Sequence, residues 1–347
     1  MILKNVITIF ALVSATAVQA LPEGIMERAI KEPPENVCDL VLWRKVRNTI
    51  HDEFGTGPCG ALARASVRLA FHDAGTYDAV SDTGGANGSI LRYREEAEQP
   101  QNNHLKTIID ALNRVYQRYA KNGVTRADIV QLAGVLGTVR CPGGPSIPFS
   151  IGRPDSIKPD IASNLPADTA SADEVIAVFA RMGLDSDEIV ALLGSHTSAK
   201  RFSSNPRVDV NDKKGLALDS TPEIWDVKYY AETLQAPKNN LTETRIAADV
   251  KIAQHWKTAR EFASYAKNQR KWNEHFSDAM VHMANLGHHK RQLVPCPIVP
   301  VSIRIPGDDS FEIEEPELPP PVCESPKPEE EEAPVLEEPE LEEPELD

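Results

Sequence analysis

The chain has 347 residues, of which 41% are hydrophobic and 26% charged, and this is enough apolar material for one large folded domain or two. The formal net charge of −15 comes from the end of the chain, because residues 308–347 hold 3 Asp, 15 Glu and one Lys, which leaves about +2 for the rest. That nearly neutral remainder has no basic cluster typical of nucleic-acid binding, so we expect no nucleic-acid partner.

The first twenty residues have the pattern of a secretory signal peptide. A basic start is followed by an apolar run over residues 6–18 and by a small-x-small site before Leu21. A membrane anchor is the weaker alternative, because the run is short of the roughly 20 residues needed to span a bilayer. No later stretch is apolar enough to cross a membrane. We therefore expect a secreted, extracellular protein without a membrane partner.

Hydrophobic periodicity predicts helices over most of the chain that follows. In chain order they cover residues 39–53, 61–73, 105–121, 125–139, 172–182, 185–193, 224–234, 246–265 and 271–286. Thr125 and Asp128 occupy capping-box positions. Residues 74–101, 141–155 and 201–221 are predicted as loops, and few alternating runs indicate strands. Residues 21–305 are thus expected to be all-α with little or no β, and the Pro/Glu-rich residues 306–347 to form a disordered acidic tail.

Arg68 and His72 are four residues apart in the second predicted helix, with Phe71 beside them. This spacing places a permanent cation and a titratable imidazole on one face, one turn apart. Such a pair could take a proton from a small substrate and stabilise the anion that leaves. The alternative is a half-buried helix whose Arg and His only solvate its ends.

His196 follows the apolar stretch IVALL at residues 189–193. It could be an ordinary interior histidine. As a haem ligand it would need a carboxylate on its other ring nitrogen, for which Asp249 is a candidate. The alternative for Asp249 is a solvent-facing helix acid.

Together and in this order, five segments resemble the plant-type haem peroxidase superfamily between about Cys38 and Cys296. They are RLAFHDAGTY at residues 68–77, GGANGSI at 84–90, GGPSIPF at 143–149 with GRPD at 152–155, EIVALLGSHT at 188–197 and LDSTPEIWD at 218–226. The resemblance implies an all-α haem peroxidase fold. Its distal half would cover residues 36–160 and its proximal half residues 161–300, with haem b between them.

The resemblance also implies a role for each site residue. His196 would be the proximal ligand of the haem iron, with Asp249 as its partner. His72 would be the distal base for hydrogen peroxide and Arg68 the cation that stabilises charge as the O–O bond breaks. Asn102 would accept the N–H of His72. Phe71 stands where the intracellular group has a tryptophan.

Two calcium sites and two disulfides are implied by the secreted fungal members of the superfamily. The proximal calcium ligands would be Thr197, Asp219, Thr221, Ile224 (carbonyl) and Asp226, all with oxygen donors. The distal ligands would be Asp73, Gly85, Asn87 and Ser89, where Asn87 replaces the usual Asp and weakens the site. The bridges would be Cys59–Cys141 and Cys38–Cys296, which leaves Cys323 unpaired. Asn240 is the expected glycosylation acceptor.

Several departures from the resemblance bear on the electron donor. Ala61, Ala65 and Phe202 replace the manganese-binding acids, and Ala191 replaces the exposed tryptophan. Leu218 and Asn205 stand at the tryptophan and the ascorbate-binding arginine of the intracellular group, although residues 74–78 and 83–89 resemble its distal loop.

We therefore expect a secreted monomer that reduces hydrogen peroxide and oxidises small phenolic donors at the haem edge. One alternative is an ascorbate-like enzyme, or one that relays electrons through a surface Tyr or Trp such as Trp225, Trp256 or Tyr229. An alternative of another class is a non-catalytic extracellular binding protein that works through its acidic tail.

Overall fold

The computed structural model describes residues 38–161, 165–201, 215–236 and 245–300. The expected signal peptide and acidic tail, together with Phe202, Asn205, Asn240 and Cys323, lie outside these residues. No helix within the described ranges is long and apolar enough to cross a membrane.

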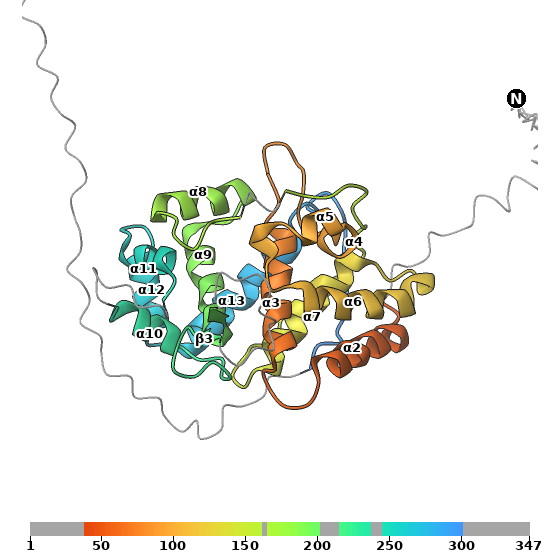
Figure 1. The fold of residues 1–347 in the computed structure, drawn as a ribbon, viewed down its shortest axis with the longest axis horizontal. Coiled ribbons are helices and arrows are strands. Elements are labelled where there is room, and N and C mark those ends of the chain that lie inside the picture. The colour runs from red at the N-terminus through yellow and green to blue at the C-terminus, as the bar shows by residue number, and fades with distance from the viewer. Residues whose placement is uncertain (1–37, 162–164, 202–214, 237–244, 301–347) are drawn as a thin grey trace, which may run out of the picture.

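The first half of the fold is a group of helices around α3 (Figure 1). Its members are α2 (Leu40–Phe54), α3 (Ala61–Ala74), α4 (Ser89–Arg92), α5 (Arg94–Ala97), η1 (Pro100–Asn102), α6 (Lys106–Tyr119), η2 (Ala120–Asn122) and α7 (Arg126–Arg140). The most extensive contact joins α3 to α7. Gly134 permits it, because a Cβ there would lie 2.5 Å from the Cβ of Ala70. The absence of that side chain allows the two helices to approach closely.

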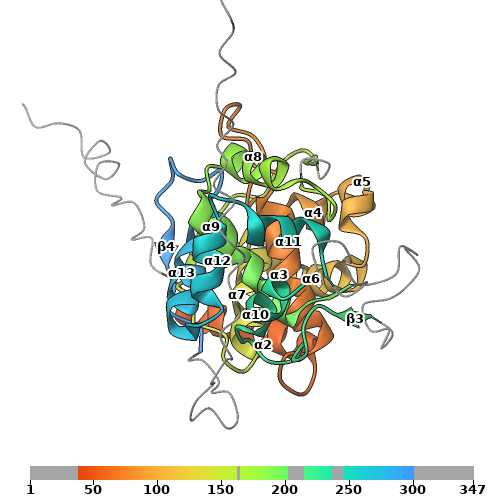
Figure 2. The same ribbon diagram turned by 90° about the vertical axis from the view of Figure 1, so that its left-hand side faces the viewer.

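The second half is also helical and packs beside the first (Figures 1 and 2). It comprises α8 (Ala172–Met182), α9 (Ser186–Leu193), η4 (Gly194–Ser198), α10 (Lys228–Leu234), α11 (Ala247–Gln254), α12 (Ala259–Tyr265) and α13 (Gln269–Ala284). Helix α13 contacts both α3 and α9, so it joins the two halves. The expected all-α fold is confirmed.

Strands are minor among the described residues. β1 (Ser150–Ile151) pairs antiparallel with β4 (Val294–Pro295), and β2 (Lys200–Arg201) pairs antiparallel with β3 (Leu216–Ala217). Each strand has only two residues, so these ladders tie loops together and form no layer of the core.

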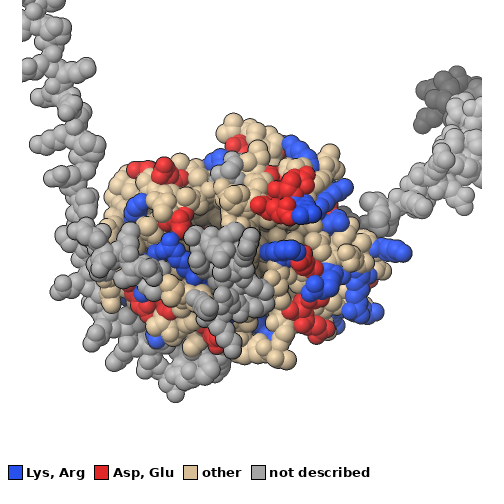
Figure 3. Space-filling model, in the orientation of Figure 1, with Lys and Arg blue, Asp and Glu red and all other residues tan. Residues whose placement is uncertain are grey.

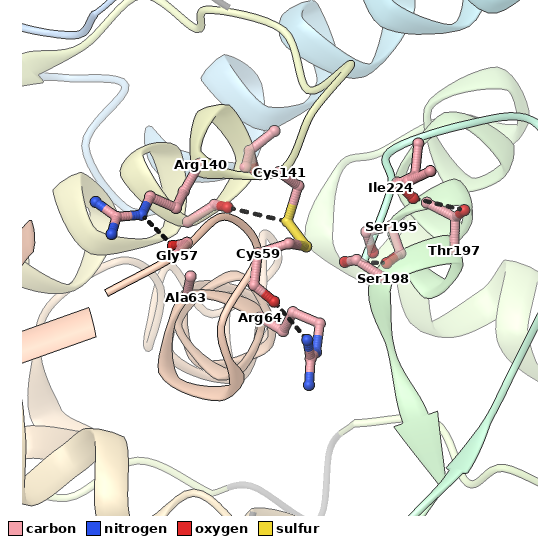
Figure 4. Close-up of a disulfide and its surroundings, with 12 residues drawn as sticks. Gly57, Cys59, Ala63, Arg64, Arg140, Cys141, Ser195, Thr197, Ser198 and Ile224 are labelled. Carbon is pink, nitrogen blue, oxygen red and sulfur yellow. Dashed lines mark hydrogen bonds between the residues drawn. A yellow bond between two sulfur atoms is a disulfide. The ribbon is translucent and has the colours of Figure 1, made fainter. Parts of the chain in front are cut away.

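Both disulfides are formed as expected. Cys38 pairs with Cys296, and Cys59 pairs with Cys141. Figure 4 shows the second bridge, which joins the loop before α3 to the end of α7. In the same view Arg140 donates from Nε to the carbonyl of Gly57, at 3.0 Å. The two ends are thus held by a covalent bond and by a hydrogen bond.

Three expectations about local structure were wrong. Residues 246–265 form two helices, because the backbone turns at His255 and the hydroxyl of Thr258 donates to the carbonyl of Ile252. The loop at residues 74–101 contains α4, α5 and part of η1. Thr125 caps α7 as expected, but Asp128 does not complete a capping box. Its carboxylate instead accepts from the guanidinium of Arg153, at 2.8 Å.

Candidate active site

Helix α3 brings Arg68 and His72 together as their spacing predicted. The Nε of Arg68 donates to Nε2 of His72 at 3.1 Å. Its Nη1 and Nη2 donate to the carbonyls of Asn103 and Gln101, both at 2.9 Å. The guanidinium therefore links α3 to η1 and to the residue that follows it, and its position is defined by three hydrogen bonds.

Asn102 completes this distal group. Its Oδ1 lies 2.7 Å from Nδ1 of His72, and its Nδ2 donates to the backbone carbonyl of Glu96 at 2.8 Å. The second bond orients the amide so that its oxygen faces the imidazole. The proton of neutral His72 must then sit on Nδ1, which leaves a lone pair on Nε2. The sequence analysis found Asn102 but missed Glu96, whose contribution here is a backbone carbonyl.

The surroundings keep His72 neutral. Burial and the charge of Arg68 lower the pKa of His72 to about 3, against a smaller opposing effect of the hydrogen bond that His72 donates to Asn102. The pKa of Arg68 falls to about 10 because the guanidinium lies deep among neighbouring atoms. Arg68 nevertheless keeps an exposed surface. At neutral pH His72 is therefore an unprotonated base, and Arg68 beside it is a cation.

Phe71 contacts the second half of the molecule. Its ring stacks on Phe179 of α8, with ring centroids 5.7 Å apart, and lies edge-on to His72 at 5.8 Å. Phe71 acts on the imidazole only through packing, since phenylalanine has no polar side-chain atom. Nothing in the spacing of the sequence indicated Phe179 as its partner.

The proximal histidine is presented by the short helix η4 directly after α9. Asp185 begins α9 with a capping box completed by Glu188, and the helix then continues through Gly194 into η4. A Cβ on Gly194 would come within 2.5 Å of Trp272, so only glycine fits where η4 begins. The Nδ1 of His196 lies 2.7 Å from Oδ2 of Asp249 on α11. The structure thus brings together the two residues that the sequence analysis paired.

Tyr229 of α10 is a third member of the proximal group. Its hydroxyl donates to the same Oδ2 of Asp249 and lies 3.3 Å from Nδ1 of His196. Burial beside Asp249 raises the pKa of Tyr229 well above its usual value, so the phenol stays protonated. Sequence reasoning proposed Tyr229 and Trp225 as surface relays, and this was wrong because both are fully buried. Trp256, the third candidate, is 73% exposed.

The arrangement of the two histidines fits a haem. The side chain of His196 is 29% exposed although that of its partner Asp249 is buried. Its Nε2 has no hydrogen-bond partner within the described residues and could bind iron, while Nδ1 is held by a carboxylate. Arg68 has an exposed surface in the other half. The face drawn in Figure 3 is hollowed between the two helix groups.

The expected proximal calcium ligands form a buried group of oxygen atoms. The hydroxyl of Thr197 donates to Asp219 Oδ2 at 2.6 Å and lies 3.4 Å from Asp226 Oδ1 and 3.5 Å from the carbonyl of Ile224. Figure 4 shows Thr197 and Ile224 pointing toward one another. Thr221 donates to the other oxygen of Asp226 at 2.8 Å. Burial raises the pKa of Asp219 to about 7 and also raises that of Asp226. This donor set suits Ca²⁺.

The expected distal calcium ligands form hydrogen bonds with residues outside the expected ligand set. Asn87 donates from Nδ2 to Asp160 at 2.8 Å, and Ser89 donates to Glu96 at 3.0 Å. Asp73 accepts from the backbone N–H of Gly88 at 3.1 Å through one carboxylate oxygen. Its other oxygen is buried without a hydrogen-bond partner. Gly85 approaches Leu286 too closely for any side chain. The distal calcium site stays a prediction.

Comparison with known proteins agrees with this geometry. A family model described as Peroxidase matches residues 43–268. Manganese peroxidase 3 of Phlebia radiata is 32% identical over 326 residues, which are 85% of each chain. The low-redox potential peroxidase of Taiwanofungus camphoratus is 32% identical over 76% of this chain and 77% of its own. The peroxisomal L-ascorbate peroxidase 5 of Arabidopsis thaliana is 32% identical over 69% and 81%.

The matched family, its fungal and plant relatives and the two histidine groups lead to one conclusion. The chain belongs to the plant-type haem peroxidase superfamily and is a hydrogen-peroxide-dependent oxidoreductase.

Proposed function

We propose that this protein is a secreted, monomeric haem peroxidase that oxidises small phenolic donors in one-electron steps. The observation that carries the proposal is the pair of opposed groups, Arg68–His72–Asn102 in one half and His196–Asp249 in the other. When bound, the haem supplies the redox-active iron at which peroxide reacts.

In this mechanism His72 moves the proton. Its unprotonated Nε2, which accepts a hydrogen bond from Arg68, takes a proton from the attacking oxygen of hydrogen peroxide and returns it to the departing oxygen, which leaves as water. Arg68 stabilises the negative charge that develops as the O–O bond breaks. Asn102 keeps the accepting nitrogen on the side of the peroxide. Two donor molecules then supply one electron and one proton each, so that one peroxide yields two waters.

His196 and Asp249 act on the opposite side. The carboxylate accepts the Nδ1–H and makes Nε2 of His196 a stronger electron donor to iron. We further propose that Thr197, Asp219, Thr221, Ile224 and Asp226 hold Ca²⁺, and that the distal group around Asp73 binds it more weakly. Thr197 adjoins His196 in the chain, so the cation would also support the position of the imidazole.

The choice of donor rests on substitutions at three positions. Ala61 and Ala65 of α3 carry no carboxylate for a metal ion, and Ala191 of α9 is buried and non-aromatic. The relative from Phlebia is named a manganese peroxidase, and the relative from Arabidopsis an ascorbate peroxidase. Small phenols need neither a manganese site nor a surface tryptophan, and they require only access to the haem edge.

Steady-state kinetics with four donors test this choice. A simple phenol should give a kcat/KM higher by about tenfold or more than Mn²⁺, veratryl alcohol or ascorbate. A preference for Mn²⁺ or ascorbate would contradict the donor assignment. The absence of any spectral change when the haem-loaded protein meets peroxide would instead contradict the enzymatic function and favour the binding-protein alternative.

A further inference from the structure

A continuous series of aromatic rings leads from the proximal histidine toward the surface. The ring of His196 lies 5.6 Å from that of Tyr229 between centroids. Tyr229 is 6.3 Å from Tyr230 on the same helix, and Tyr230 is 5.5 Å from Tyr265 at the end of α12. Each ring is therefore close to the next. All three tyrosines are fully buried.

The outer end of this series is a hydrogen-bonded pair between two helices. The hydroxyl of Tyr265 lies 2.8 Å from Nδ1 of His275 on α13, and the two rings meet edge-on at 5.6 Å. The side chain of His275 is 42% exposed. Helices α12 and α13 lie side by side (Figure 2). His275 therefore connects a buried phenol with solvent.

A carboxylate and an ammonium group flank this pair. Glu261 Oε1 lies 3.5 Å from Nδ1 of His275 and 2.8 Å from Nζ of Lys271. The Glu261 side chain is 14% exposed and that of Lys271 34% exposed. The phenol–imidazole pair thus sits beside a partly buried ion pair, so polar groups surround the point at which a proton would arrive.

Tyr265, unlike Tyr230 and Trp272, has a side-chain proton acceptor. Tyr229 also has one, the carboxylate of Asp249, but lies at the inner end of the series. Burial raises the pKa of the Tyr265 phenol, so it is neutral, and one-electron oxidation requires that its proton leave at the same time. A neutral imidazole has a lone pair on one ring nitrogen and can take that proton. Tyr230 donates to the backbone carbonyls of Val190 and Ala191, and Trp272, another neighbour of Tyr230, donates to the carbonyl of Ala191. A carbonyl is not a base near neutral pH.

We propose that Tyr265 and His275 form a second oxidation site, at which the protein oxidises donors too large to reach the haem. The proposal rests on the peroxidase function above, with hydrogen peroxide as the oxidant acting through the haem. One electron passes from Tyr265 along Tyr230 and Tyr229, and the phenolic proton passes to His275. A donor at the surface then returns one electron to Tyr265 and loses one proton to solvent, while His275 gives the phenolic proton back to Tyr265. Two such cycles consume the two oxidising equivalents of each peroxide.

Freeze-quench electron paramagnetic resonance tests the site directly. The haem-loaded protein is mixed with one equivalent of hydrogen peroxide without donor, and the tyrosyl signal is recorded for the wild type, Tyr265→Phe, His275→Gln and Tyr119→Phe. Tyr119 is the matched control, because it is a buried tyrosine of the other half whose hydroxyl is hydrogen-bonded to Thr49 at 2.9 Å. His275→Gln keeps a polar partner but removes the base.

We expect the tyrosyl signal to fall by about tenfold in Tyr265→Phe and His275→Gln and to persist in Tyr119→Phe. Labelling with a nitroso spin trap should locate the wild-type adduct on Tyr265. An unchanged signal in both site variants, or an adduct on Trp272 or Trp256, would overturn the proposal. His275→Gln alters only a half-exposed side chain, so the test stands even if Tyr265→Phe folds poorly.

A pair of donors separates this site from the haem edge. Oxidation of dextran-linked tyramine should fall by about tenfold in both site variants, whereas oxidation of free tyramine should change less than about twofold. Equal losses for the two donors would contradict a separate surface site. Failure of the wild type to oxidise even free tyramine would contradict the peroxidase function itself, which is a different result.

Discussion

Each histidine of the site is oriented by one oxygen atom at its Nδ1, but the two acceptors differ in charge. His72 faces the neutral amide of Asn102, and His196 faces the carboxylate of Asp249. A carboxylate attracts the Nδ1 proton more strongly than an amide does. This increases the electron density on Nε2 and makes it a better metal ligand. An amide oxygen only selects the tautomer of His72 with its proton on Nδ1, so the imidazole stays a weak, unprotonated base. The same side chain is thereby suited to two different tasks.

Replacement of the distal histidine should separate peroxide chemistry from haem binding. We expect His72→Leu to slow the reaction with peroxide by about two to four orders of magnitude, because the proton has no acceptor. The haem absorption should remain, since His196 is unchanged. Stopped-flow spectroscopy measures both, with His282→Leu, a surface change in α13, as the control. A nearly normal rate in His72→Leu would rule out the role assigned to His72.

The pH dependence of the peroxide reaction follows from the lowered pKa of His72. The imidazole accepts a proton only in its neutral form, and its pKa is about 3. The second-order rate constant should therefore stay level as the pH falls from 7 to about 4 and decline only near pH 3. An inflection near pH 6.5, the ordinary histidine value, would show that His72 is not shielded in this way.

Among the helices, a buried ion pair links α7, α13 and the short strand β1. Arg153 donates to Asp128 of α7 at 2.8 Å and to the carbonyl of Ala284, at the end of α13, at 2.7 Å. Its Nη1 also donates to Ser150 O in β1. Asp128 in turn accepts from the backbone N–H of Gly152 at 2.8 Å. These contacts of Arg153 and Asp128, which we call the clamp, hold the GRPD segment at residues 152–155 in its place in the fold.

Removing one charge of this clamp should destabilise the protein strongly. The Arg153 and Asp128 side chains are 2% and 3% exposed, so Asp128→Asn leaves a buried cation unpaired. We expect a loss of about 3–5 kcal/mol in the free energy of unfolding, measured by urea titration. The control is Glu98→Gln in the exposed pair with Arg94, which should cost less than about 1 kcal/mol. Similar losses in both variants would contradict the clamp.

Sequence reasoning was most accurate for helices with local signals. Asp39 caps α2, Ser171 and Glu174 form the capping box of α8, and Asp185 and Glu188 form that of α9. Caps act within one turn and therefore appear in the sequence. The break at residues 255–258 was missed because the apolar periodicity continues across it. Only the hydroxyl of Thr258 and the packing of α12 end that helix.

In the whole molecule, the halves are joined by α13, by the stacked rings of Phe71 and Phe179, and by Arg181. The guanidinium of Arg181, on α8, donates to the carbonyl of Gly75 at 3.0 Å and to that of Tyr77. The Cys38–Cys296 bridge ties the start of α2 to the segment after α13. These links hold α3 and η4 in one orientation, on which the proposed binding of a haem between His72 and His196 would depend.

Removal of calcium from the proximal site should alter the surroundings of the haem, because the site lies in the proximal half. Without a cation, Asp219 and Asp226 are two buried carboxylates at close range, next to Thr197. We expect EGTA to lower the melting temperature and to alter the Soret band, and Ca²⁺ but not Mg²⁺ to restore both. Asp219→Asn should abolish the difference between the treated and untreated protein. A melting temperature insensitive to EGTA would contradict the proximal site.

The sequence by itself determined the helical class, most helix positions, the family and the pairing of His196 with Asp249. Periodicity and caps are local signals, and the five segments occur in the order typical of the superfamily. Only the tertiary structure decided that Tyr229 shares Asp249, that Phe179 covers Phe71, and that Tyr265 meets His275. These contacts join separate helices, and their geometry depends on how the helices pack, which residue spacing does not encode.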